Sequence, residues 1–71
     1  MFDYSRLKGR MREKGYTQEK LADAIGISTV ALRKKLQGGR PYFKADEMFA
    51  IGKALDIDSL DAYFFKPKLS N

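Results

Sequence analysis

Residues 17–38 read TQEKLADAIGISTVALRKKLQG, which is two short amphipathic runs separated by a glycine. Thr17 and Ser28 are good N-caps, and each stands directly before a short amphipathic run. Gly26 ends the first run at a position where a residue with a left-handed backbone is needed. Only one residue separates this glycine from the second cap, so we expect the chain to turn sharply between two short helices.

The side chains on either side of this turn have the spacing that a helix-turn-helix requires. Ala22 must be small because the second helix of the pair crosses the first there, and Leu32 returns from the second helix to fill the space under the turn. Each feature alone is common, but together with the two caps they are specific. We therefore interpret the stretch as a helix-turn-helix formed by the second and third helices of the chain.

The rest of the chain adds three more helical patterns and no alternating strand pattern of useful length. Tyr4, Leu7 and Met11 recur on one side of the first helix. The five expected helices run from the cap Asp3 to Gly15, over 18–25, 29–37 and about 44–55, and then after Asp58 or Ser59. We expect an all-α, compact bundle of these short helices over residues 1–65, followed by a polar, flexible tail over residues 66–71.

Length and composition narrow the range of functions. The 71 residues make one small domain, and the lack of Cys and His argues against disulfides, thiol nucleophiles, imidazole chemistry and ordinary zinc sites. No apolar run approaches the roughly 18 residues of a membrane span, and the start of the chain is unlike a signal peptide. We expect no enzyme, no cofactor, no small-molecule ligand and no membrane contact, and we place the protein in the cytoplasm.

The net charge of +5 is distributed unevenly along the chain. Residues 1–40 hold ten basic and four acidic side chains, whereas residues 41–71 hold four basic and five acidic ones. This asymmetry indicates that one half of the molecule faces a polyanion, and nucleic acid is the first candidate. A solvated surface with a basic isoelectric point would give the same balance.

Features on both sides of the motif carry a resemblance to a known family. They are the opening FDYSRLKGR (2–10), the LQG at 36–38, Phe43, the helix with Met48, Ile51 and Leu55, and the final YFF (63–65). In these the chain resembles the Cro/repressor-type helix-turn-helix family of phages and bacterial regulators, in particular short prophage Cro-like proteins, from Phe2 to Phe65. The resemblance implies a lambda-repressor-like fold and sequence-specific binding of double-stranded operator DNA on the nucleoid of a bacterial cell. It also implies a two-fold dimer, with half-sites about one turn (~34 Å) apart.

In such a motif the third helix lies in the major groove, and residues near its start meet base edges. The side chains that face away from the expected core are Thr29, Val30, Arg33 and Lys34. Arg33 or Lys34 can donate to guanine O6 and N7. The Thr29 hydroxyl can serve either polarity, and Val30 can pack on a thymine methyl group. Many family members have Gln at the positions of Thr29 and Val30, so bidentate recognition of adenine is not expected here.

Contacts to phosphates are expected to fix the register on the duplex. The N-terminal end of the second helix offers free backbone N–H groups, and Gln18 matches the family's phosphate-binding glutamine. The expected phosphate contacts are Thr17, Gln18, Ser28, Lys35, Arg40, Lys44 and Arg10. At Lys35 many relatives have an apolar residue, and its core role passes to Leu36. For the basic residues of the first helix, a solvated face is the alternative.

Three adjacent aromatic residues, 63–65, cannot all face one interior from a single short helix. At least one of them is expected to be exposed in a monomer. Burial in a two-fold interface would account for this, and the expected dimer interface consists of Leu60, Tyr63, Phe64 and Phe65. In the alternative, Tyr63 tolerates water through its hydroxyl while Phe64 and Phe65 fold back under the tail.

The function expected from these observations is sequence-specific DNA binding that regulates transcription. A second hypothesis, from a different class, is a helix-turn-helix domain used for protein contact, such as an antitoxin or an anti-repressor that occupies another regulator. A stoichiometric protein partner, without affinity for DNA, would distinguish the second hypothesis from the first.

Overall fold

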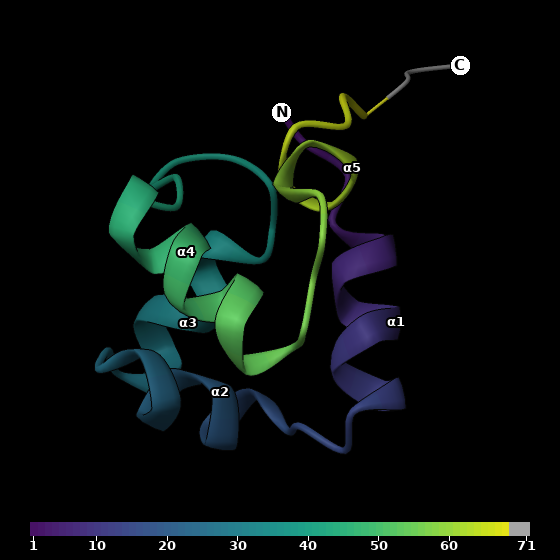
Figure 1. The fold of residues 1–71 in the computed structure, drawn as a ribbon. Coiled ribbons are helices and arrows are strands. Elements are labelled where there is room, and N and C mark those ends of the chain that lie inside the picture. The colour runs from purple at the N-terminus through teal and green to yellow at the C-terminus, as the bar shows by residue number, and fades with distance from the viewer. Residues whose placement is uncertain (69–71) are drawn as a thin grey trace.

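A computed structural model describes residues 1–68 of the chain. Within this range there are five helices and no β-strand, which confirms the expected all-α architecture (Figure 1). The helices are α1 (Ser5–Glu13), α2 (Gln18–Ile25), α3 (Thr29–Lys35), α4 (Ala45–Ala54) and α5 (Leu60–Phe64). The third helix ends two residues earlier than expected. None of these helices combines the length and the apolar character that crossing a membrane would require.

The local signals around α2 and α3 act as the sequence indicates. The Thr17 hydroxyl accepts a hydrogen bond from the Lys20 backbone N–H (3.1 Å), and the Ser28 hydroxyl accepts one from the Ala31 backbone N–H (3.0 Å). Gly26 has a φ of 80°, the left-handed conformation that ends α2. Both N-caps and the glycine stop are therefore confirmed.

The start of α1 differs slightly from the expectation. Its N-cap position is Tyr4, not Asp3. The Asp3 carboxylate nevertheless accepts hydrogen bonds from the Ser5 hydroxyl (2.7 Å) and the Ser5 backbone N–H (3.0 Å). These bonds lower the pKa of Asp3, and the charges of Lys66 and Lys68 add to the effect. Asp3 thus stabilises the first turn of α1 from the position before the N-cap.

One hydrophobic core holds the helices together. α2 packs against both α3 and α4, and α5 packs against α4 and α1. The buried side chains are Tyr4, Leu7, Met11, Leu21, Ala22, Leu32, Leu36, Phe43, Ile51, Leu55 and Phe64. Each fully buried leucine contributes about 1.5–3 kcal/mol relative to an exposed one. Ala22 and Leu32 both lie in this core, so the turn between α2 and α3 is closed from beneath by side chains of both helices.

Three aromatic rings pack together in the part of the core between the start of α1, the loop before α4 and α5. The ring centroids of Tyr4 and Phe64 each lie 5.4 Å from that of Phe43, and the contacts are edge-to-face. Burial raises the pKa of Tyr4 above its usual value, and Tyr42 adds to the shift. Phe64 is completely buried. The expectation that Phe64 belongs to a dimer interface is therefore wrong, because its side chain fills the core of its own chain.

The two ends of the described chain run side by side. Phe2 and Pro67 form an isolated antiparallel bridge, flanked by a hydrogen bond from the Asp3 N–H to the Lys66 carbonyl (2.8 Å). The Phe2 N–H also donates to the carbonyl of Gly38, which has a φ of 91°. The first residues of the expected tail are thus paired with the N-terminal segment. The remainder of that tail, residues 69–71, lies outside the described residues.

Candidate nucleic-acid interface

The outward side of α3 carries the four side chains expected to read bases. Arg33 and Lys34 are exposed, Val30 is 59% exposed, and Thr29 is half-buried near the start of the helix. The opposite side of α3 lies in the core through Leu32. Val30 precedes Arg33 and Lys34 by three and four positions, so the three side chains share one side of the helix.

A hydrogen bond joins this side of α3 to the first residue of α2. The Arg33 Nε donates to the Gln18 Oε1 at 3.3 Å. Because the bond uses Nε, the terminal nitrogens of the guanidinium stay free to donate elsewhere. Gln18 and Arg33, which the sequence assigns to different kinds of contact, therefore lie side by side.

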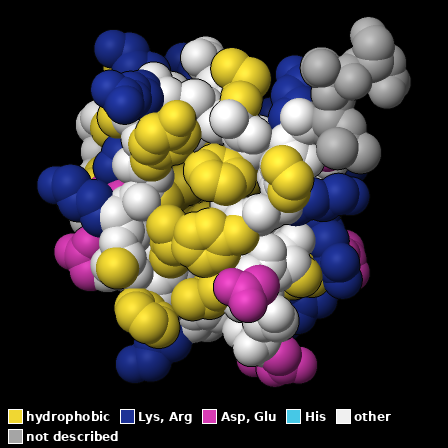
Figure 2. Space-filling model, turned by 90° about the horizontal axis from the view of Figure 1, so that it is seen from above, with side chains coloured by type: hydrophobic (Ala, Val, Ile, Leu, Met, Phe, Trp, Pro, Cys, Tyr) yellow, Lys and Arg dark blue, Asp and Glu magenta, His cyan; other side chains and the backbone are white. Residues whose placement is uncertain are grey.

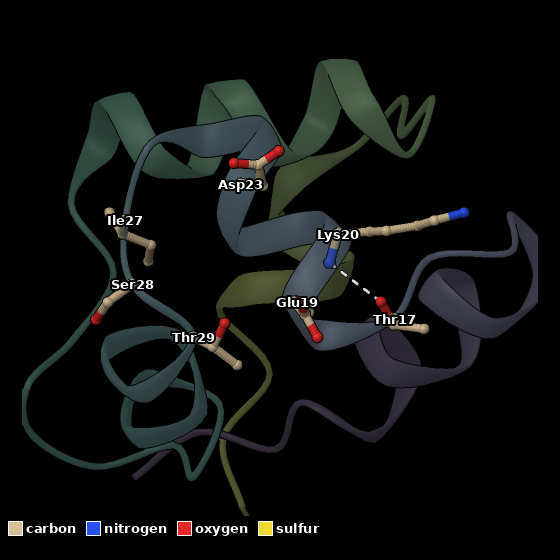
Figure 3. Close-up of a pocket in the computed structure, with 7 residues that line it drawn as sticks. All are labelled: Thr17, Glu19, Lys20, Asp23, Ile27, Ser28 and Thr29. Carbon is tan, nitrogen blue, oxygen red and sulfur yellow. Dashed lines mark hydrogen bonds between the residues drawn. The ribbon is translucent and has the colours of Figure 1, made fainter.

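The outer faces of α2 and α3 enclose a shallow hollow of about 600 Å³ (Figure 3). Its lining residues are Thr17, Glu19, Lys20, Asp23, Ile27, Ser28 and Thr29. Thr17 and Ser28 are exposed here, but their oxygens already cap the two helices. The charged side chains of the hollow are two acids and one lysine, which does not favour a phosphate. The hydroxyl protons of both caps stay available to donate.

A smaller hollow between α1 and α2 has the opposite charge. It measures about 230 Å³ and is lined by Lys8, Met11, Arg12, Tyr16 and Gln18. Both of its charged side chains are basic, and it shares Gln18 with the hydrogen bond to α3. Lys8 is not among the contacts expected from the sequence, and a solvated face is the alternative expected for the basic residues of α1. The signal that could have found it is the spacing of Lys8 and Arg12, four positions apart on one side of a helix.

Lys35 does not lie with the other candidate phosphate contacts. Only 7% of the residue is exposed, and its Nζ lies 2.7 Å and 2.6 Å from the two carboxylate oxygens of Glu47 on α4. The expectation that Lys35 contacts a phosphate is therefore wrong, because its ammonium group is committed to an interior ion pair. The core role expected for Leu36 is confirmed, since that side chain is buried as well.

The Glu47 carboxylate is held on more than one side. Its Oε1 also accepts a hydrogen bond from the Lys44 backbone N–H at 2.8 Å. Burial by itself raises the pKa of Glu47, but the hydrogen bonds from Lys35 and Lys44 and the charges of both lysines outweigh it. The pKa of Glu47 therefore lies below its usual value. The group is a carboxylate at neutral pH.

Arg10 is also occupied inside the protein. Its Nε donates to the Leu55 carbonyl at 2.9 Å and its Nη2 to the Asp56 carbonyl at 3.0 Å, at the C-terminal end of α4. A guanidinium at this end of a helix satisfies carbonyl groups that have no partner within the helix. The expectation that Arg10 contacts a phosphate is thus corrected to a structural role.

The two remaining candidate phosphate contacts are exposed. Arg40 lies in the loop between α3 and α4, and Lys44 occupies the N-cap position of α4. Only the backbone N–H of Lys44 takes part in the bond to Glu47, so its ammonium group stays at the surface. Both cations lie in the segment that joins α3 to α4.

A separate apolar face lies around the N-terminus and α5. Figure 2 shows hydrophobic side chains gathered in the middle of this face, with Lys and Arg side chains around it. Phe65 is 47% exposed and its ring lies 6.1 Å from that of Phe2, which also meets Tyr42 at 5.8 Å. This confirms that one of the three adjacent aromatics is exposed. Leu60 and Tyr63 are half-buried.

Two further members of this apolar face do not follow from the sequence pattern. Phe2 comes from the opposite end of the chain, and Tyr42 comes from the loop before α4. The pairing of the two chain ends brings Phe2 beside Phe65, and Tyr42 packs on Phe2. A contact between segments so far apart in the sequence leaves no local pattern that could have predicted it.

Comparison with known proteins gives a family but no activity. A family model described as "Protein of unknown function (DUF739)" matches residues 1–67, which include all five helices and both surfaces described above. No curated protein matches the chain.

Proposed function

We propose that this chain, which belongs to the DUF739 family, is a sequence-specific DNA-binding regulator of transcription. In this proposal α2, the turn at Gly26 and α3 are a helix-turn-helix, α3 enters the major groove, and α2 lies across the phosphate backbone. The observation that carries the proposal is the outward side of α3, where an exposed valine stands beside two exposed cations.

Each of these side chains has a chemical counterpart on a base edge. Arg33 or Lys34 donates to the O6 and N7 acceptors of guanine, and Val30 packs on the methyl group of thymine. Thr29 offers a hydroxyl that donates or accepts. The hydrogen bond to Gln18 orients the Arg33 guanidinium, which reduces the conformational entropy that binding would otherwise cost.

Phosphate contacts surround this reading surface. Lys8 and Arg12 on α1, with Gln18 at the start of α2, receive the backbone on one side. Arg40 and Lys44, which are exposed in the segment between α3 and α4, are further cationic contacts. Thr17 and Ser28 contribute hydroxyl donors, although Glu19 and Asp23 nearby oppose a phosphate there. Such contacts release counterions and make the affinity depend steeply on salt.

The apolar face is proposed as the contact with a second copy of the chain. A two-fold interface places the same patch on both copies, and a patch of aromatic rings buries well against itself. The proposed interface keeps Leu60, Tyr63 and Phe65 and replaces Phe64 by Phe2 and Tyr42. Phe65→Ser should lower the dimer population in sedimentation equilibrium. Val30→Ser is the matched control in this DNA-free measurement, because Val30 is 59% exposed on the outward side of α3.

The test of the proposed function is selection of bound sequences from random duplexes at about 150 mM salt, where nonspecific binding is weak. The proposal predicts an enriched motif with two related halves about one helical turn apart. Lys44→Ala should then weaken binding to all sequences alike and reduce the salt slope by about one. No enriched motif, together with a stoichiometric protein partner, would favour the protein-contact hypothesis instead.

A further inference from the structure

We propose that the buried ion pair between Lys35 and Glu47 is a positioning device, which sets the orientation of α3 and thereby the DNA sequence that the protein prefers. The proposal rests on the proposed function. It means that two residues that do not contact DNA contribute to the choice of DNA sequence.

The ion pair ties the end of α3 to the first turn of α4. Both carboxylate oxygens of Glu47 lie within hydrogen-bond distance of the Lys35 Nζ, at 2.7 Å and 2.6 Å. The carboxylate is itself fixed by the Lys44 backbone N–H at 2.8 Å. Lys35 and Glu47 are the buried charged residues of the described part of the chain. The ammonium group is therefore anchored to a point that does not belong to α3.

Because α3 is a rigid helix, fixing one of its side chains also fixes the rotation of the helix about its axis. Consecutive residues of an α-helix are about 100° apart around the axis. Lys35 directly follows Arg33 and Lys34, so fixing Lys35 towards α4 fixes where these two point. The other inward contacts of α3 are Leu32 and Leu36, and hydrophobic contact is not directional. Charge-assisted hydrogen bonds are directional, so they can hold one rotation of the helix about its axis.

Stability alone does not explain why a pair of charges occupies this position. Taking two charges out of water is costly, and replacing a buried pair by apolar side chains of similar volume is often neutral or stabilising. An apolar pair at these positions would fill the same space between α3 and α4 without fixing the rotation of α3. What the ion pair adds is a defined geometry beside the reading surface.

The experiment compares the wild-type protein with Lys35→Met/Glu47→Leu. The double variant removes one positive and one negative charge, so the net charge is unchanged. Affinities are measured on the selected duplex and on a random duplex over a range of salt. We expect an unchanged salt slope and an unchanged affinity for random DNA. The preference for the selected duplex should fall at least about fivefold, the lower end of what one base contact provides.

Two further variants keep the test decisive. Met48→Leu, a volume-conserving change at a half-buried position of α4, should leave the preference unchanged. Lys35→Met/Glu47→Gln retains an acceptor for the Lys44 N–H and should lose preference in the same way as the first double variant. If neither double variant folds, the pair is required for folding itself and the positioning role is overturned.

The outcomes separate this proposal from the proposed function. A wild-type protein without any sequence preference refutes the proposed function before any variant is compared. A wild-type preference that the folded double variants retain in full refutes the positioning role and leaves the DNA-binding function standing. Equal losses on selected and random duplexes would also overturn it, because they would indicate a general loss of binding.

Discussion

Replacing Glu47 by glutamine should destabilise the protein strongly. The change keeps the size of the side chain and removes its charge, so the Lys35 ammonium, in a residue that is 7% exposed, loses its counterion. Breaking a buried pair from one side costs about 3–5 kcal/mol, because an uncompensated charge is left inside. A domain of this length has a total stability of about 4–11 kcal/mol. The variant should therefore be close to unfolding.

Urea denaturation followed by circular dichroism measures this loss. With a slope of about 1 kcal/mol per molar urea, the midpoint should fall by several molar. Glu19→Gln, which makes the same chemical change at an exposed site on α2, should stay within about 0.5 kcal/mol of the wild type. A Glu47→Gln midpoint as high as that of this control would show that the Lys35 ammonium reaches water at little cost and does not depend on Glu47.

The pH dependence of the free energy of unfolding provides a second test of the role of Glu47. The pKa of Glu47 is lower in the folded protein than the usual value of 4.5, so the folded state binds this proton less readily than the unfolded state does. The stabilisation is therefore complete above that usual value and is lost as the pH falls through the lower, folded value. The stability difference between wild type and Glu47→Gln should shrink over this acidic range. A difference that stays constant down to the acid transition would contradict the assignment.

Three further predictions follow from the surfaces and the backbone. Arg33→Ala should reduce the difference in binding free energy between the selected and a random duplex by roughly 1–3 kcal/mol, measured by titration at fixed salt. An equal loss of affinity for both duplexes would refute the role of Arg33 in reading bases. Lys8→Ala and Arg12→Ala should each reduce the slope of log affinity against log salt by about one, whereas the control Lys53→Ala on α4 should leave the slope unchanged. Equal slopes for all three variants would show that α1 does not contact the DNA. Gly38→Ala should lower the midpoint of thermal unfolding, because φ is 91° at this position and the new Cβ would collide with the Phe2 backbone carbonyl. An unchanged midpoint would show that the N-terminal segment can shift to accommodate the Cβ without loss of stability.

Local signals made the helices predictable. Thr17, Gly26 and Ser28 act on backbone groups within three or four residues of themselves, so their effect can be inferred from the sequence alone. The apolar positions of α2 and α3 likewise follow the helical period. The exposed side of α3 is the complement of this pattern, which is why its four candidate base contacts could be named in advance.

The corrected residues depend on contacts between distant parts of the chain. Arg10 finds its carbonyl partners at the end of α4, and Lys35 finds its carboxylate on a different helix. The helical pattern does not distinguish a basic residue that hydrogen-bonds to a neighbouring helix from one that faces solvent. Phe64 and Phe65 are neighbours of similar chemistry, and only the packing of α5 decides which is buried.

The most direct test of DNA recognition through α3 is the change of backbone amide chemical shifts when the selected duplex is added to the labelled protein. If α3 reads the bases, the largest changes should fall on residues 29–34 and on Gln18, with smaller ones at Lys8 and Arg12. The amides around Phe65 should change little once dimer formation is saturated. Changes concentrated at the Phe65 face, with α3 unaffected, would contradict DNA recognition through α3.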